Sequence, residues 1–237
     1  MLKAVIFDMD GVLVDSHPSH KTAWRKFLLR HGKEMQESHL ELLRSGRKKD
    51  ELLQCFLGNL TSDQIRAYGQ EKDMFFQEEM ANTTAIAGVR DLLCELSEAN
   101  LSMAVASCGG RARVHQTLEL LKINQYFRVV TTGDDVTRGK PDAEIYHRTT
   151  AQLGVPPADS LVFEDSVSGI LAATAAGMKS VGITDPQHAQ YLLEAGAVET
   201  RPDFSYVSFE QVQQLFSLKP QKIKWEMPEA EIPGVVP

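Results

Sequence analysis

The sequence predicts an α/β protein: a doubly wound, mostly parallel sheet with an inserted α-helical domain. Short apolar runs end abruptly in acids or glycines, and helical patterns alternate with these runs. One interval between two runs is about three times as long as the roughly 30 residues of a strand–helix–strand unit. Together these observations indicate a sheet covered by helices on both faces, with an extra helical unit after its first strand.

Five apolar runs are expected to form the strands: residues 2–7, 101–107, 127–132, 161–163 and 179–183. Both faces of each run are apolar, which is typical of strands buried between two layers of helices. Ligands of such sheets bind at the carboxyl ends of the strands. Asp8 and Asp165 follow a run closely and Ser107 ends one, so we expect their side chains to meet at one edge of the sheet.

Helices are expected between these runs, where apolar residues recur at helical spacing. The intervals are residues 88–99, 112–121, 143–153, 168–176 and 187–195. This alternation of strand and helix is what a doubly wound sheet requires.

The long interval after the first strand contains helical patterns only. They cover residues 17–31, 48–57 and 62–80, with glycines as breaks. An insertion at this point stands over the strand ends, where a lid belongs.

Three parts of the chain follow from these patterns. They are a core of residues 1–15 and 85–218, a helical cap of residues 16–84 and a C-terminal tail of residues 219–237. The tail is rich in proline and has no periodicity, so it is expected to be extended.

The composition narrows the function classes. A net charge of −7 argues against a basic nucleic-acid footprint, and no run reaches the roughly 18 apolar residues of a membrane span. Three cysteines without a CxxC pair indicate a reducing compartment, so a cytoplasmic protein is expected. Cys55 and Cys94 lie in helical patterns and are expected to be buried.

The stretch VIFDMDGVLVDS, residues 5–16, runs from an apolar strand into two carboxylates. Side chains alternate along a strand, so Asp8 and Asp10 are expected on the same side. Two like charges this close are tolerated where a metal ion offsets them or where one carboxylate keeps its proton. Gly11 allows the chain to turn sharply after them.

Three further fragments follow in order: VASCGG with Ser107, GKPDAEIY with Lys140, and FEDSVSGILAATAAGM with Glu164 and Asp165. Together with FDMDGVLVDS they resemble the motifs of the haloacid dehalogenase superfamily of phosphotransferases, over about residues 1–218. The helical insertion resembles the caps of its β-phosphoglucomutase and sugar-phosphate phosphatase-like members. The resemblance implies a Rossmann-like core and a cap that closes over the site.

The same residues suit phosphoryl transfer on chemical grounds. A phosphate monoester needs a nucleophile that can leave again, and a carboxylate that forms an acyl phosphate meets this need. Asp8 is expected to attack, as the resemblance also implies. Asp10 is expected to protonate the leaving-group oxygen and later to deprotonate the attacking water, which contributes roughly 10²–10⁴-fold. Lys140 is expected to place a positive charge at the phosphoryl group.

Mg²⁺ is the expected cofactor, because a few carboxylates together with water and substrate phosphate suit this ion. The expected ligands are the carboxylates of Asp8 and Asp165 and the backbone carbonyl of Asp10. Glu164 is adjacent and is expected to ligate directly or through water. The ion would lower the repulsion between the anionic nucleophile and the anionic substrate.

Phosphate oxygens are expected to bind at the loop after the second apolar run. Ser107 and the backbone N–H groups of Cys108 and Gly109 can donate to them, because the Gly-Gly pair permits a backbone nest. Lys140 adds its charge to this group. Cys108 is not expected to be a nucleophile, because no histidine lies in a matching motif.

Two pieces of the cap are candidates for contacts with the substrate. The resemblance places His20 at the cap hinge and near the sugar, and it places Gly46, Arg47 and Lys49 in the loop that reads the non-reacting end. An arginine there could hold a second phosphate bidentately. The alternative interpretations are a solvated histidine and a solvated, basic start of a helix.

The sequence therefore predicts a Mg²⁺-dependent phosphatase of a small phosphorylated metabolite, with a sugar phosphate as substrate and an aspartyl phosphate as intermediate. The alternative is β-phosphoglucomutase, which passes the phosphoryl group to a sugar hydroxyl. A receiver-like phospho-switch fits less well, because the acceptor follows the first strand and the insertion serves substrate selection. An inactive binding protein fits less well because the reacting residues are all present. A monomer or weak homodimer is expected, without nucleic-acid or membrane partners.

Overall fold

The computed structural model describes residues 1–43 and 48–219, and it confirms the predicted α/β class. Within these residues, six parallel strands form one sheet in the order β5-β4-β1-β6-β7-β8. The strands are β1 (Ala4–Phe7), β4 (Ser102–Ala106), β5 (Val129–Thr131), β6 (Ser160–Glu164), β7 (Lys179–Ile183) and β8 (Glu199–Arg201). The chain reverses its winding beside β1, so the carboxyl end of β1 lies at the switch point where ligands bind in such sheets.

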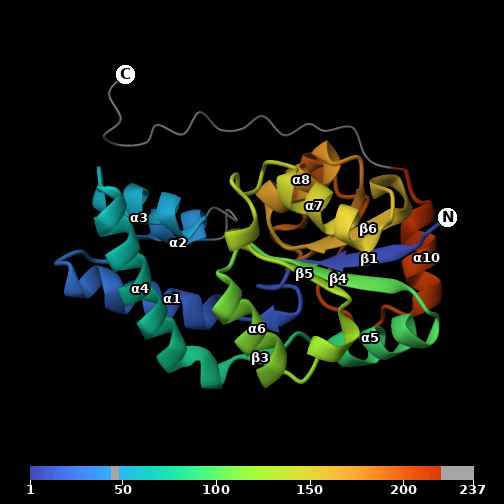
Figure 1. Ribbon diagram of the computed structural model, residues 1–237, viewed down its shortest axis with the longest axis horizontal. Coiled ribbons are helices and arrows are strands. Elements are labelled where there is room, and N and C mark those ends of the chain that lie inside the picture. Colours follow the sequence, from blue (N-terminus) through green and yellow to red (C-terminus); the bar gives the residue numbers. More distant parts are fainter. Residues whose placement is uncertain (44–47, 220–237) are drawn as a thin grey trace.

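Helices cover both faces of the sheet (Figure 1). On one face lie α7 (Glu144–Leu153) and α8 (Val167–Ala175), and on the other lie α5 (Val89–Glu98), α6 (Arg111–Leu120) and α10 (Phe209–Ser217). The helix α9 (Ala189–Ala195) packs on α8 and β7. The residues of β1 are fully buried, because apolar clusters press on both sides of this strand.

Among the described residues, four α-helices lie between the two short strands β2 (Val14–Asp15) and β3 (Thr84–Ala85), which pair antiparallel. They are α1 (His17–Arg30), α2 (Glu37–Leu43), α3 (Lys49–Leu57) and α4 (Ser62–Glu79). Their apolar side chains form a separate cluster around Trp24, Phe27 and Phe56. In Figure 1 these helices lie at the end of the molecule toward which β1 runs.

Single turns of 3₁₀ helix connect several elements. They are η1 (Met80–Asn82), η2 (Asn124–Tyr126), η3 (Gly133–Asp135) and η4 (Pro157–Asp159).

Some elements depart from the sequence-based expectation. The strand β8 and the helices α2 and α10 lie outside every predicted range, because β8 is a short polar edge strand and α2 is only seven residues long. The helix α10 does carry a signal, the capping box between Ser208 and Gln211. Cys94 was expected to be buried but is exposed, since it lies on the outer side of α5 beside Glu98.

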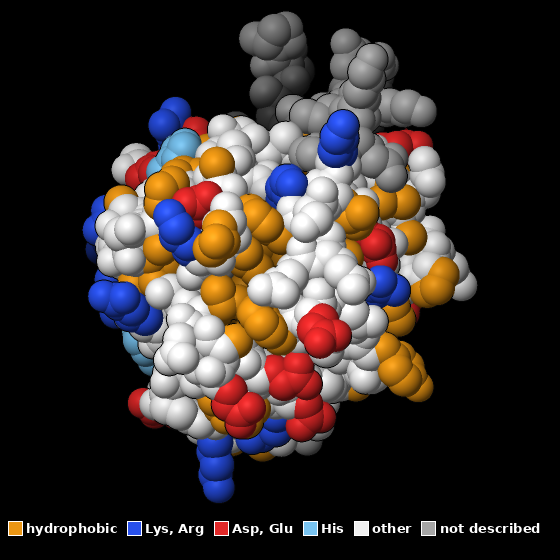
Figure 2. Space-filling view, turned by 90° about the vertical axis from the view of Figure 1, so that its right-hand side faces the viewer, with side chains coloured by type: hydrophobic (Ala, Val, Ile, Leu, Met, Phe, Trp, Pro, Cys, Tyr) orange, Lys and Arg blue, Asp and Glu red, His pale blue; other side chains and the backbone are white. Residues whose placement is uncertain are grey.

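The surface at the end of the core remote from the cap helices mixes apolar and charged side chains, with acidic ones gathered in its lower part (Figure 2). Along the two described ranges, no helix combines the length and apolar character that spanning a membrane would require.

Candidate active site

Asp8 stands at the centre of the site because β1 is a central strand of the sheet. Its backbone N–H donates to Phe163 O of β6 at 2.9 Å, which continues the strand pairing up to the carboxylate. Asp8 is 7% exposed. The strand therefore delivers a carboxylate at a fixed position and leaves only its outer side open to a ligand.

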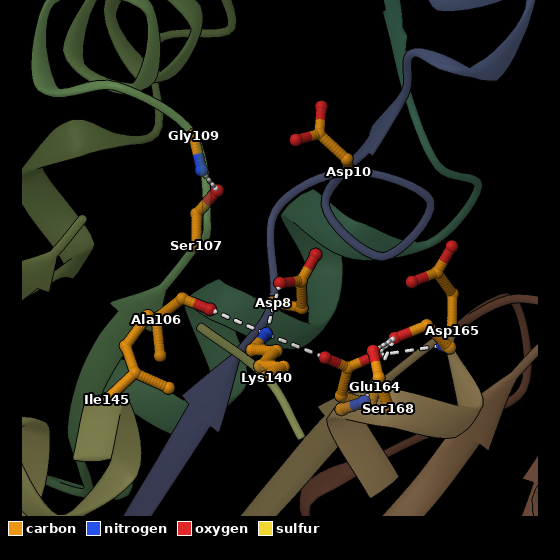
Figure 3. Close-up of polar contacts among 12 residues, drawn as sticks. Asp8, Asp10, Ala106, Ser107, Gly109, Lys140, Ile145, Glu164, Asp165 and Ser168 are labelled. Atoms are coloured by element: carbon orange, nitrogen blue, oxygen red, sulfur yellow. Dashed lines mark hydrogen bonds and ion pairs between the residues drawn. The ribbon is translucent and has the colours of Figure 1, made fainter. Parts of the chain in front are cut away.

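Lys140 bridges two carboxylates beneath this position (Figure 3). Its Nζ donates to Asp8 Oδ1 at 2.6 Å, to Glu164 Oε1 at 2.6 Å and to the backbone oxygen of Ala106 at 3.0 Å. The Lys140 side chain is 2% exposed, and its three donors have three acceptors. One ammonium thus joins β1, β4 and β6 at their carboxyl ends.

Glu164 is held rigidly at the end of β6. Its Oε2 accepts from the backbone N–H and the hydroxyl of Ser166, at 2.8 and 3.0 Å. The Ser166 hydroxyl in turn accepts from Gly169 N and caps α8. A side chain on Gly169 would collide with the Glu164 carboxylate, so the glycine allows α8 to begin directly beside the site.

The protonation equilibria follow from burial and from an excess of carboxylates. Burial raises the pKa of Asp8 well above its usual value, and Glu164 and Asp165 raise it further, while Lys140 lowers it. Burial by itself would lower the pKa of Lys140, but Asp8 and Glu164 raise it well above its usual value. The lysine therefore stays charged, and the carboxyl groups of Asp8, Glu164 and Asp165 outnumber it.

The loop after β4 presents donors beside Asp8. Ser107 is 1% exposed, and its hydroxyl accepts from Gly109 N at 3.1 Å. The carbonyl of Gly109 accepts from Gly133 N at 2.9 Å, which fixes the loop against the segment after β5. Burial raises the pKa of the Cys108 thiol, so this group is a poor nucleophile.

Asp10 faces a different set of partners. Arg113 donates to both of its oxygens, from Nη1 to Oδ1 at 2.8 Å and from Nη2 to Oδ2 at 2.7 Å. The Ser16 hydroxyl donates to Oδ1 at 2.6 Å. Burial raises the pKa of Asp10, but the Arg113 guanidinium and the hydrogen bond from His20 together hold it well below its usual value. Asp10 is therefore ionised in this arrangement.

The helices α1 and α4 contribute the other side of this network. Lys72 of α4 is 3% exposed, and its Nζ lies 3.1 Å from His20 Nδ1 and 4.9 Å from the centre of the Phe76 ring. Burial, then the charge of Lys72, lowers the pKa of His20 to about 3. Neutral His20 accepts from Lys72 through Nδ1, so Nε2 carries the proton and faces Asp10 Oδ1 at 3.4 Å.

The donor set suits a hard divalent cation. Figure 3 shows Asp8, Asp10 and Asp165 grouped at the ends of the strands. Gly11 has φ +78°, and a side chain there would collide with the Asp165 carboxylate, so the glycine allows Asp165 to approach the turn after β1. His17 Nε2 lies 2.9 Å from Asp165 Oδ2.

Side chains alone do not complete a metal site in the part of the chain that the structure describes. No group of three or more His, Cys, Asp or Glu side chains there could hold a metal ion. Two carboxylates and a backbone carbonyl are nevertheless the kind of sparse protein set with which Mg²⁺ keeps its waters. Burial raises the pKa values of Asp8 and Asp165, and a bound cation would favour the ionised forms of both carboxyl groups.

Most residues singled out in the sequence meet at this edge of the sheet. They are Asp8, Asp10, His20, Ser107, Cys108, Gly109, Lys140, Glu164 and Asp165. Lys49 instead forms an ion pair with Asp73 inside the cap, at 2.5 Å. Gly46 and Arg47 lie outside the described residues.

Sequence reasoning missed two cations of the site. Lys72 could have been found, because its spacing from Ile65, Gly69 and Phe76 places it on the inner face of α4. Arg113 carried no such signal, since nothing in the sequence distinguishes it from the exposed Arg111 on the same helix.

Comparisons with known proteins agree with this geometry. The sequence matches the family described as haloacid dehalogenase-like hydrolase over residues 5–183. It is 33% identical to validoxylamine A 7'-phosphate phosphatase of Streptomyces hygroscopicus subsp. limoneus, over 82% of this chain and 92% of that protein. It is 34% identical to a phosphorylated carbohydrates phosphatase of Thermotoga maritima, over 83% of this chain and 93% of that protein.

Mutases are also among the similar proteins. The sequence is 31% identical to β-phosphoglucomutase of Bacillus subtilis, over 78% of this chain and 85% of that protein. The crystal structure of β-phosphoglucomutase from Clostridium difficile matches with a TM-score of 0.82 and 25% identity, covering 91% of this chain and 97% of that chain.

Proposed function

The chain belongs to the haloacid dehalogenase-like hydrolases, and from this premise we propose that it is a Mg²⁺-dependent phosphatase of a phosphorylated sugar or a related metabolite. Its relatives include phosphatases named for phosphorylated carbohydrates and for validoxylamine A 7'-phosphate. The observation that carries the proposal is the Lys140 ammonium, which lies 2.6 Å from both Asp8 and Glu164 beside the Ser107 loop.

The first step is attack on the phosphate ester. A carboxylate oxygen of Asp8 forms a bond to phosphorus while the bond from phosphorus to the leaving-group oxygen breaks. Ser107 and the N–H groups of Cys108 and Gly109 bind the other phosphoryl oxygens, and Lys140 offsets their charge. The leaving-group oxygen takes a proton from Asp10 and departs as an alcohol.

The second step is hydrolysis of the aspartyl phosphate. Water attacks phosphorus, its proton passes to Asp10, and the bond from phosphorus to Asp8 breaks to release inorganic phosphate. Asp10 can accept this proton, because its pairing with Arg113 keeps its carboxyl group ionised. Its role as an acid in the first step requires that Arg113 release one of its oxygens and that this oxygen take up a proton from solvent before the ester is cleaved.

Mg²⁺ would be held by the carboxylates of Asp8 and Asp165 and by the backbone carbonyl of Asp10, with Glu164 nearby. When bound, it would supply positive charge that lowers the repulsion between Asp8 and the phosphate.

Residues 16–84 act as a cap domain in this proposal, and the remaining described residues form the core. The basis is that α1 to α4 share their own apolar cluster and reach the site through His20, Lys72 and Phe76. A cap excludes bulk water during the reaction and admits substrate when it opens.

The test is release of phosphate by the purified protein with Mg²⁺. p-Nitrophenyl phosphate and a panel of sugar phosphates are the substrates, and Asp8→Asn is the matched variant. We expect the variant to lose at least about 10³-fold in kcat, and EDTA to abolish activity that Mg²⁺ then restores. Absence of turnover in the wild type on every substrate would contradict the proposal, as would unchanged activity in Asp8→Asn.

The similarity to β-phosphoglucomutases makes phosphoryl transfer between sugar hydroxyls a second candidate. β-Glucose 1-phosphate with a catalytic amount of glucose 1,6-bisphosphate separates the two. Free phosphate supports the phosphatase. Glucose 6-phosphate without free phosphate would replace it with the mutase.

A further inference from the structure

Arg113 occupies a place that its pairing with Asp10 does not by itself explain. It lies in the first turns of α6, directly after the phosphate-binding loop, and its side chain is 16% exposed. A side chain on Gly109 would collide with the guanidinium, so the glycine makes room for Arg113 against the loop backbone. The guanidinium carbon also lies 5.3 Å from the centre of the Phe76 ring of the cap. Arg113 thus fills the space between the phosphate-binding loop and the cap.

This space is where the leaving group of a substrate must lie. A phosphoryl group at Asp8 is held by the Ser107 loop on one side, and the rest of the substrate extends toward the cap. Gly109, which belongs to that loop, and Asp10, which serves the leaving-group oxygen, both contact the guanidinium. Arg113 can therefore contact the leaving group and not only the phosphoryl group.

The charges around this space are unbalanced. Arg113 and the buried Lys72 face it together with His20, and Asp10 is the carboxylate that Arg113 and His20 contact there. Asp73 also acts on both cations, but it is paired with Lys49. Burial, then the charge of Arg113, lowers the pKa of Lys72 to about 7, so the ammonium carries a charge part of the time at neutral pH. A neutral sugar would leave these cations without a second anion, whereas an acidic leaving group would supply one.

We propose that Arg113 determines specificity by binding a second acidic group on the leaving group, so that the substrate is an acidic phosphorylated metabolite. The inference rests on the proposed phosphatase function. Both terminal nitrogens of Arg113 donate to the Asp10 carboxylate, and the acidic group of the substrate would accept the same two hydrogen bonds. A carboxylate or a second phosphate has this chemistry. When the acidic group of the substrate replaces Asp10 at the Arg113 guanidinium, the Asp10 carboxylate can turn toward the leaving-group oxygen.

The test compares substrates that differ only in the second acidic group. The carboxylate pairs are 3-phosphoglycerate with glycerol 3-phosphate, and 6-phosphogluconate with glucitol 6-phosphate. The phosphate pair is fructose 1,6-bisphosphate with fructose 6-phosphate. The readout is the ratio of kcat/KM within each pair, for the wild type, Arg113→Gln, Arg113→Lys and the control Arg111→Gln. Arg111 is 54% exposed on the same helix and pairs with Asp135.

We expect the wild type to favour the acidic member of at least one pair by roughly 10- to 100-fold, the value of a charge-assisted hydrogen-bond pair. Arg113→Gln should bring the ratio close to one, and Arg111→Gln should preserve it. Arg113→Lys keeps the positive charge but cannot donate from two nitrogens, so it should lower the ratio several-fold. This variant still tests the inference if Arg113→Gln does not fold. The pair that responds identifies the acid as carboxylate or phosphate.

Two results would overturn the inference while leaving the phosphatase function in place. One is a wild type that hydrolyses the neutral member of every pair as well as the acidic member. The other is a preference that survives in Arg113→Gln. Failure to release phosphate from p-nitrophenyl phosphate and from all six metabolites would instead overturn the proposed function, and the inference with it.

Discussion

Lys140 is the residue on which the site's electrostatics depend, because it is the cation between two buried carboxylates. Its replacement in Lys140→Met would leave Asp8 and Glu164 facing each other without compensation. Removing one partner of a buried ion pair costs about 3–5 kcal/mol. We therefore expect a loss of this order in the free energy of unfolding, measured by urea denaturation, together with loss of phosphatase activity.

Two variants make this prediction specific to the buried cluster. Lys3→Met removes a lysine that is 54% exposed and pairs with Asp159, and it should change the free energy of unfolding by less than about 1 kcal/mol. Glu164→Gln in the Lys140→Met background removes one of the uncompensated charges and should restore part of the stability. A double variant less stable than Lys140→Met would show that the charge argument is wrong.

Single residues also show what the sequence could and could not predict about the site. Asp8 and Lys140 lie in motifs whose chemistry is recognisable without a structure, and their contacts follow from strands that end side by side. Arg113 depends on which way one turn of α6 faces relative to Gly109 and the cap. That orientation is set by tertiary packing, so no local pattern could reveal it.

At the scale of elements, the first turn of α8 packs directly against the Glu164 carboxylate because residue 169 is a glycine. A glycine inside a helix is normally less stable than alanine by up to about 1 kcal/mol. At Gly169 the added methyl group would collide with the Glu164 carboxylate, and overpacking of this kind costs about 1–3 kcal/mol. We expect Gly169→Ala to lower the free energy of unfolding and to reduce kcat, because Glu164 loses its position at Lys140.

Gly69 of α4 is the matched control. It is also a helical glycine, but its added methyl group would meet the flexible end of Lys49, 3.1 Å from Cε, and would make an ordinary van der Waals contact with Leu53 Cδ1 at 3.8 Å. Gly69→Ala should therefore be neutral or stabilising by up to about 1 kcal/mol. Equal effects of the two substitutions in urea denaturation would rule out the close approach of α8 to Glu164.

The cap meets the core through a second contact, at the start of α3. Lys48 Nζ donates to the backbone oxygens of Val136 and Thr137 at 3.2 and 3.1 Å, and its aliphatic part lies over Gly139. Lys48→Met removes both hydrogen bonds, which are worth about 1 kcal/mol each. We expect a several-fold rise in KM with a small change in kcat, and faster amide hydrogen exchange in α3.

The control is Lys26→Met, because Lys26 pairs with Glu78 and Glu79 entirely within the cap. It should leave KM within about twofold of the wild type. If Lys48→Met behaves like Lys26→Met, the Lys48 contact does not hold the cap on the core.

Strands and helices differ in how well their existence and their ends can be predicted from the sequence. The ends of the buried strands and of the helices around them were predicted to within two residues, because each element carries an apolar period and a polar end. The edge strand β8 and the helix α2 were not, since a three-residue edge strand is specified by its neighbour β7 rather than by its own composition. Elements that depend on tertiary partners are those that a single sequence leaves undetermined.

At the scale of the whole molecule, Lys72 links stability to pH across the boundary between cap and core. It belongs to α4, but burial and then Arg113 of the core lower its pKa to about 7, against about 10.4 in an unfolded chain. The folded state therefore binds fewer protons than the unfolded state between these values. Stability contributed through this group rises as pH rises from about 7 toward about 10, by at most about 1.4 kcal/mol per pH unit.

Lys72→Met removes this linkage while keeping an apolar side chain of similar length. We expect the variant to be more stable than the wild type at pH 7, and the difference in the free energy of unfolding to shrink by about 2 kcal/mol between pH 7 and pH 9. Lys21→Met, at an exposed position of α1, controls for loss of charge alone. Urea denaturation at several pH values gives both curves. Because Arg113 contributes to the depressed pKa only while the cap packs on the core, a difference that does not change with pH would mean that Lys72 is not buried against Arg113 in solution.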